Sequence, residues 1–60
     1  MTTLRVISNE NYESVLKIGE TLTSKESVND GSVTFYLIQK TGLNIFNYAW
    51  LLESHFEVIN

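Results

Sequence analysis

A chain of 60 residues without a single cysteine has few ways to stabilise a fold. Domains of this size bury only about 60% of the surface that the unfolded chain exposes, so their stability is marginal. Many are held together by disulfides or by a metal bound through thiolates, and the composition excludes both. Packing of one small core, or association with another chain, must therefore supply the stability. We expect a single small globular domain over residues 1–60.

The hydrophobic fraction of 43% is typical of a globular protein, while the net charge is −3 and the pI is near 4.8. The four Lys and Arg residues are scattered, so the chain lacks the basic cluster that direct nucleic-acid binding requires. The first residues lack the apolar stretch of a signal peptide, and no segment approaches the roughly 20 apolar residues of a membrane span. We expect a cytoplasmic protein that binds neither nucleic acid nor membranes.

The beginning of the chain predicts a strand followed by a helix. Residues 3–8, TLRVIS, form a short β-type run. Ser8 or Asn9 can then cap a helix, because a short polar side chain satisfies the free backbone N–H groups of the first turn. The apolar positions that follow have the spacing of an amphipathic helix: Tyr12, Val15, Leu16, Gly19 and Leu22. We predict a helix over residues 9–23.

Residues 23–32, TSKESVNDGS, form the one polar stretch of the chain. The favoured interpretation is a solvated connection. The alternative is a hairpin that turns at Asp-Gly, in which residues 24–28 are a short strand paired with the next one. That next segment, SVTFYLIQ over residues 32–39, is β-branched and aromatic and has turn residues on both sides. Both of its faces are apolar, which predicts a central strand.

The apolar run TGLNIFNYAWLLESHF over residues 41–56 is compatible with a helix and with a strand. In a helix, one broad arc collects the apolar side chains Ile45, Phe46, Ala49, Trp50, Leu52 and Phe56. In a strand, Phe46, Tyr48 and Trp50 share a face and neither face is polar. We favour a helix over residues 43–55, and we expect FEVIN at the end of the chain to be a short strand.

The predicted element order is β-α-β-α-β, or β-α-β-β-α if the hairpin forms. Both orders correspond to an α+β fold, a small two-layer sandwich in which one or two helices pack on a three- or four-stranded sheet. The sequence shows no internal repeat, no low-complexity tract and no linker between domains.

No residue pattern indicates catalysis, a cofactor or a metal. His55 is the only histidine, and with Glu53 and Glu57 it would form a weak ligand set. The serines lack the flanking sequence of an activated nucleophile, and the three glycines are too far apart for a phosphate-binding loop. We therefore expect a non-enzymatic protein with no catalytic, cofactor-binding or metal-binding residues.

The second half of the chain has more apolar side chains than its core can use. Residues 31–60 contain 16 of the 26 hydrophobic residues. Tyr36, Tyr48 and Leu51 have no obvious place in the core, and Trp50 is added to them although it lies on the apolar arc. The predicted partner-binding residues are thus Tyr36, Tyr48, Trp50 and Leu51. Tyr and Trp are enriched at protein interfaces and their hot spots. The sequence thus predicts a small regulator or inhibitor that binds and modulates another protein through an aromatic face, and that forms a homodimer through it.

A second hypothesis depends on the carboxylates of residues 9–30, where five acidic residues stand against two lysines. The acidic residues are Glu10, Glu13, Glu20, Glu26 and Asp30. An acidic helix face can imitate a phosphate backbone, and the chain would then inhibit a nucleic-acid-binding protein. A solvated helix face is the simpler interpretation, because five carboxylates are few for such a mimic.

Overall fold

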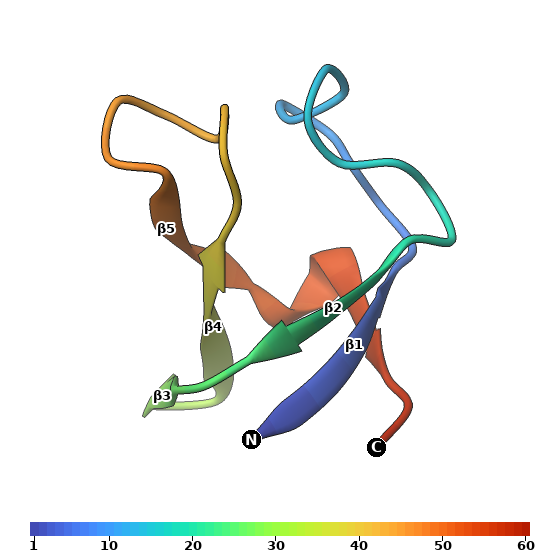
Figure 1. Cartoon of the computed structure of the whole chain (residues 1–60). Helices are drawn as coiled ribbons and strands as arrows, with labels where there is room; N and C mark the ends of the chain where they lie inside the picture. The colour runs from blue at the N-terminus through green and yellow to red at the C-terminus, as the bar shows by residue number, and fades with distance from the viewer.

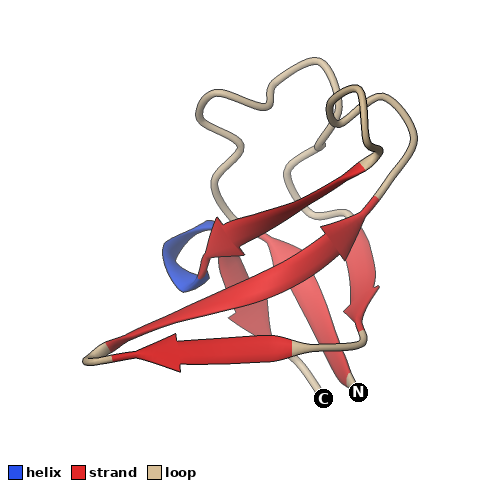
Figure 2. Cartoon of the chain, turned by 90° about the vertical axis from the view of Figure 1, so that its left-hand side faces the viewer, coloured by secondary structure: helices blue, strands red, loops and turns tan.

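The computed structural model describes all 60 residues and consists of two three-stranded antiparallel sheets (Figures 1 and 2). The first sheet has the order β2-β1-β6 and the second has the order β3-β4-β5. The strands are β1 (Thr2–Val6), β2 (Thr21–Ser24), β3 (Ser27–Asp30), β4 (Val33–Gln39), β5 (Tyr48–Leu52) and β6 (Phe56–Val58). A short 3-10 turn, η1 (Glu53–His55), joins β5 to β6. The termini lie side by side, and the Thr3 N–H donates to the Asn60 carbonyl.

The predicted α+β sandwich is wrong, because neither predicted helix forms. Residues 7–20 are a long loop, and residues 43–55 are divided between a loop, β5 and η1. The predicted strands over residues 3–8, 32–39 and 56–60 are confirmed as β1, β4 and β6, and β4 is the central strand of its sheet. η1 has only three residues, so the structure has no helix that could span a membrane.

The loop over residues 7–20 buries much of the apolar pattern that predicted a helix. Leu16 is fully buried, and Tyr12 and Val15 pack against the core. Asn11 and Gly19, however, have φ angles of 73° and 90°, which a right-handed helix does not allow. The apolar pattern therefore predicted correctly that these side chains pack against the core, but it did not predict the backbone conformation, which is a loop and not a helix.

The favoured interpretation of the polar stretch, a solvated connection, is wrong, because a hairpin forms there. Its strand is residues 27–30 and not the predicted 24–28, and it does not turn at Asp-Gly. β3 pairs with β4 from Ser27 opposite Tyr36 to Asp30 opposite Val33, so the two-residue turn consists of Gly31 and Ser32. Gly31 has φ of 70°, a value that suits glycine in such turns. The polar stretch is thus an edge strand and a turn, where polar side chains remain in water.

β2 and β3 are nearly continuous, and the chain bends between them from one sheet to the other. Ser24 stands at this bend and is the only buried polar residue. Its Oγ lies 2.8 Å from the Glu26 carbonyl oxygen and 2.9 Å from that of Leu37, so its hydroxyl proton always has an acceptor. This contact ties the bend to β4, as at the corners of two sheets that are packed across each other.

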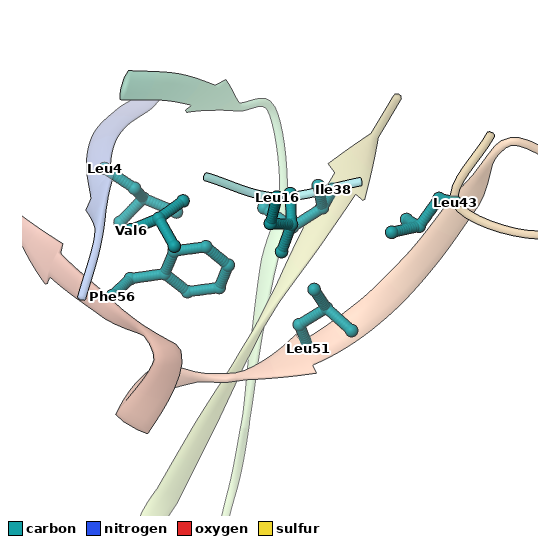
Figure 3. Close-up of a cluster of buried hydrophobic side chains, with 7 residues drawn as sticks. All are labelled: Leu4, Val6, Leu16, Ile38, Leu43, Leu51 and Phe56. Atoms are coloured by element: carbon teal, nitrogen blue, oxygen red, sulfur yellow. The ribbon is translucent and has the colours of Figure 1, made fainter. Parts of the chain in front are cut away.

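The core lies between the two sheets and under the long loop (Figure 3). It consists of Leu4, Val6, Leu16, Ile38, Leu43, Leu51 and Phe56. Only eight of the 60 residues are buried, Ser24 included. Such a small core leaves little spare stability, and it leaves many large apolar side chains outside.

Candidate protein-binding site

The outer face of the first sheet is polar. Leu4 and Val6 of β1 point into the core, so the alternate residues Thr3 and Arg5 point outward. Thr3 lies opposite Thr23 in the sheet, and Arg5 lies opposite Thr21 and Glu57. The Arg5 Nη1 and Glu57 Oε1 atoms are 2.9 Å apart and form an exposed ion pair. This face is the solvated surface that an antiparallel sheet normally presents to water.

The outer face of the second sheet is apolar. On β4, Tyr36 and Ile38 face the core, so the alternate residues face outward. The strand register places the outward residues of β3 and β5 beside them. We call the result the outer apolar face, and it comprises Val28, Val33, Phe35, Leu37, Tyr48, Trp50 and Leu52. The polar residues in register with this face stand at its margins: Asp30 at the end of β3, Gln39 at the end of β4 opposite Tyr48, and Glu26 just before β3, opposite Leu37.

A shallow depression crosses the middle of the outer apolar face. Val28, Phe35 and Trp50 line it, one from each strand, and its volume is about 460 Å³. Phe35 lies opposite Val28 on one side and Leu52 on the other, so the strand pairing fixes these positions. No polar side chain lines the depression. It therefore suits an apolar side chain of a partner better than a substrate that polar groups must orient.

The loop over residues 40–47 extends this surface beyond the sheet. The Asn44 side chain accepts a hydrogen bond from the Phe46 N–H (2.8 Å) and donates one to the Tyr48 carbonyl (2.7 Å). Ile45 and Phe46 stand at the exposed end of the loop. The Phe46 ring lies beside that of Tyr48, with 6.1 Å between the centroids. In the predicted helix Phe46 lies on the apolar arc, the side expected to face the core. This is wrong, because the residue is 66% exposed.

The four sequence-predicted residues do not lie on one face. Tyr48 and Trp50 belong to the outer apolar face and are 46% and 43% exposed. Tyr36 and Leu51 lie opposite each other in the register but point inward. Leu51 is buried in the core, and the Tyr36 ring meets that of Phe56 edge-on, with 6.2 Å between the centroids. Of the four predicted residues, the structure therefore places two, Tyr48 and Trp50, together on a face that a partner can reach.

Sequence reasoning did not select Val28, Phe35, Leu37 or Leu52 as binding residues. The alternation in residues 33–39 carried a usable signal, since it places Val33, Phe35 and Leu37 on one face. The signal was incomplete because nothing in the sequence says which of two apolar faces is covered by the rest of the chain.

The five carboxylates of the second hypothesis do not form a helix face. Glu10 and Glu13 lie on the long loop, whereas Glu26 and Asp30 lie at or near β3. Glu20 forms an ion pair with Lys40 and accepts a hydrogen bond from the Lys17 N–H (3.0 Å). The hydrogen bond from the Lys40 ammonium, supported by that from Lys17, holds the pKa of Glu20 below its usual value.

His55 and its two neighbouring carboxylates have separate partners. The His55 Nδ1 lies 2.9 Å from the Ser8 carbonyl oxygen. Glu57 pairs with Arg5, and the Glu53 carboxylate accepts the Thr34 N–H. No group of three His, Asp or Glu side chains in the structure is placed to hold a metal ion.

No protein-family model, curated protein or solved structure matches the chain.

Proposed function

We propose that this chain is a small non-enzymatic protein that binds and modulates another protein through the outer apolar face, and that it does so as a homodimer. The observation that supports the proposal is the contrast between the two sheets. The first sheet covers its outer face with Thr, Arg and Glu, while the second leaves seven apolar side chains there. Antiparallel sheets with one unburied face normally make that face polar, so an apolar one calls for a covering partner.

The size of the exposed surface supports the same proposal. Phe46, Tyr48 and Trp50 are between 43% and 66% exposed. Aromatic side chains have about 150–250 Å² to bury, so these three leave roughly 250–400 Å² of largely apolar surface in water. With the valines and Leu52 the area is on the order of 500 Å², which is in the range of the functional patches of monomeric proteins. Trp and Tyr are also the side chains that most often dominate binding energies.

We propose the cytoplasm as the compartment in which the protein works. The chain has no disulfide and therefore does not need an oxidising environment to fold. The acidic-mimic hypothesis has no structural observation in its favour. Its carboxylates are dispersed over a loop and an edge strand, and one of them is neutralised by Lys40.

The test is affinity capture from the cells that make the protein, with the tagged wild type and three variants. Val28→Asp and Trp50→Ala change the depression on the outer apolar face, whereas Thr23→Asp places a charge on the polar face as a matched control. We expect the wild type and Thr23→Asp to capture the same protein, including at high salt, because an apolar interface is not screened. Val28→Asp and Trp50→Ala, verified as folded by circular dichroism, should lose it. Retention of the captured protein by both folded face variants would refute the proposal.

A further inference from the structure

One backbone edge of β5 has no partner strand. β5 is the last strand in the order β3-β4-β5 (Figure 1). The Lys40 N–H donates to the Asn47 carbonyl (3.0 Å), and hydrogen-bonded pairs alternate along antiparallel strands. Ala49 and Leu51 therefore face β4 with their backbone groups. The N–H and C=O groups of Tyr48, Trp50 and Leu52 point the other way.

The hydrogen bonds on the other side of β4, toward β3, agree with this alternation of backbone groups. The Leu37 N–H donates to the Glu26 carbonyl (3.0 Å), so Leu37 faces β3 and its neighbour Ile38 faces β5. The assignment of the free edge of β5 is thus supported from both sides of the central strand. Two carbonyls on this edge already have a partner: the Tyr48 carbonyl accepts from the Asn44 side-chain amide, and the Leu52 carbonyl begins the 3-10 turn η1. A carbonyl oxygen can accept a second hydrogen bond, so both remain usable.

The other three edge strands carry features that discourage strand pairing. β2 is short and polar, β3 ends in Asn29 and Asp30, and β6 has three residues of which one is Glu57. β5, with the sequence YAWLL, has no charge and no proline. Natural proteins protect free edges with charges, prolines or short strands, and an unprotected apolar edge is a template for another strand.

We infer that a second copy of this chain pairs its own β5 with this edge, antiparallel and with the two-fold axis at Trp50. Both backbone groups of Trp50 face the edge, so the two Trp50 residues can exchange two hydrogen bonds. Tyr48 of each copy then lies opposite Leu52 of the other, and their side chains meet on the outer side of the sheet. No charged residue lies within β5, so no like charges face each other across the axis.

Area is the reason for a second copy. A standard interface takes about 800 Å² from each partner, and one outer apolar face together with Phe46 exposes only on the order of 500 Å². Pairing of the two edges makes one six-stranded sheet, in which the two outer apolar faces form a single surface large enough for such an interface. The inference rests on the proposed function in this respect: the dimer is the form that presents the complete binding surface.

Cysteine cross-linking tests the register directly, because the natural chain contains no thiol. Tyr48→Cys and Leu52→Cys are prepared separately and mixed under mild oxidation. In the proposed dimer these positions are opposite each other at about 5.5 Å between Cα atoms, within the range of about 4.4–6.8 Å that a disulfide spans. Two copies of Tyr48→Cys alone hold their thiols roughly 14 Å or more apart.

We expect a disulfide dimer in the mixture and none from either variant alone. Absence of a disulfide in the mixture, or equal cross-linking by each variant alone, would overturn the proposed pairing.

Leu52→Pro tests the edge itself. Leu52 has φ −62° and ψ 145°, which proline adopts without strain, and its N–H points away from β4. Proline therefore removes a donor from the free edge and none from the sheet. Leu52→Ala is the matched control, because it shortens the side chain and keeps the N–H. Sedimentation should show a dimer for the wild type and for Leu52→Ala, and a folded monomer for Leu52→Pro.

A wild type that is monomeric at high micromolar concentration, or an unchanged dimer in Leu52→Pro, would refute the inference. The failures of the two proposals are separable. A monomeric protein that still captures its partner through Val28 and Trp50 would refute the dimer and leave the outer apolar face as the binding site. A dimer that captures its partner without those side chains would refute the outer apolar face as the binding site and leave the β5 pairing.

Discussion

Trp50 and Leu51 are neighbours in the chain, but they contribute to different parts of the molecule. Successive side chains of a strand point to opposite faces, so Leu51 is buried in the core while Trp50 lies on the outer apolar face. Leu51 therefore contributes to folding, and Trp50 is available to a partner. The two roles are separated by one residue, which is why a helical interpretation of this segment misassigns them.

Leu51→Ala should lower the free energy of unfolding by about 2–5 kcal/mol, because it removes a buried side chain from a core of seven apolar residues. Phe46→Ala should change it by no more than about 0.5 kcal/mol, because most of the Phe46 ring is already in water. Urea denaturation of both variants measures the difference. A large loss in Phe46→Ala would show that the loop over residues 40–47 supports the core.

Glu20 and Lys40 form the most protected ion pair of the molecule, with 23% and 28% of their side chains exposed. Because the pKa of Glu20 is lowered in the folded state, the pair stabilises the fold above the usual glutamate value of 4.5. This contribution is lost as the pH falls through the lower pKa of the folded state. Glu20→Gln should cost about 1 kcal/mol at neutral pH and flatten the acid limb of the stability curve.

Denaturation measured from neutral to acidic pH, with Glu13→Gln as the control, checks this prediction. Glu13 is exposed on the same loop and has no ion pair in the structure. If Glu13→Gln flattens the acid limb as much as Glu20→Gln does, the Lys40 pair is not its cause.

At the scale of elements, the sequence predicted the strands whose alternation is undisturbed and failed where a turn residue interrupts a pattern. β4 was predictable because residues 33–39 are β-branched and aromatic and lie between turns. The two helix predictions were wrong because Asn11, Gly19 and Asn47 take positive φ angles. The spacing of apolar residues, on which the predictions rested, does not reveal such angles. The bend at Ser24, which divides the strands between two sheets, depends on long-range contacts with β4.

The binding surface was predictable to the same extent. Tyr48 and Trp50 were selected as apolar residues outside the core, and they do lie on the outer side of the sheet. Leu51 was selected on the geometry of a helix, and the strand turns it inward. Val28 could not be selected, because its place beside Phe35 is set by the hairpin register and not by its local sequence.

Gly19→Ala distinguishes the loop from a helix by the sign of its effect. In the loop Gly19 has φ of 90°, and a Cβ atom there would meet nothing within 4 Å. The cost is therefore one of backbone conformation, about 1–2 kcal/mol for a residue with a side chain. In a helix the same substitution would stabilise by up to about 1 kcal/mol. Urea denaturation gives the sign, and a stabilised Gly19→Ala variant would contradict the loop conformation.

The whole molecule combines a small core with a free edge and an apolar face, so its folding should depend on its association. Ligands and partners that bind only the folded state raise its stability in proportion to the logarithm of their concentration. If a second copy occupies the edge of β5, the melting temperature of the wild type should rise with protein concentration. That of Leu52→Pro should be constant, because its edge lacks a donor that the pairing needs.

Thermal melts over a hundredfold range of protein concentration can be followed by the fluorescence of the single tryptophan. They give the melting temperature and the emission wavelength of the folded protein in one experiment. Trp50 lies at the proposed two-fold axis, so its emission should shift to shorter wavelength as copies associate and the ring leaves water. The shift and the rise in melting temperature should have the same concentration midpoint, since one equilibrium causes both. A melting temperature that rises while the emission of the folded protein stays constant would place the association elsewhere on the molecule, away from β5.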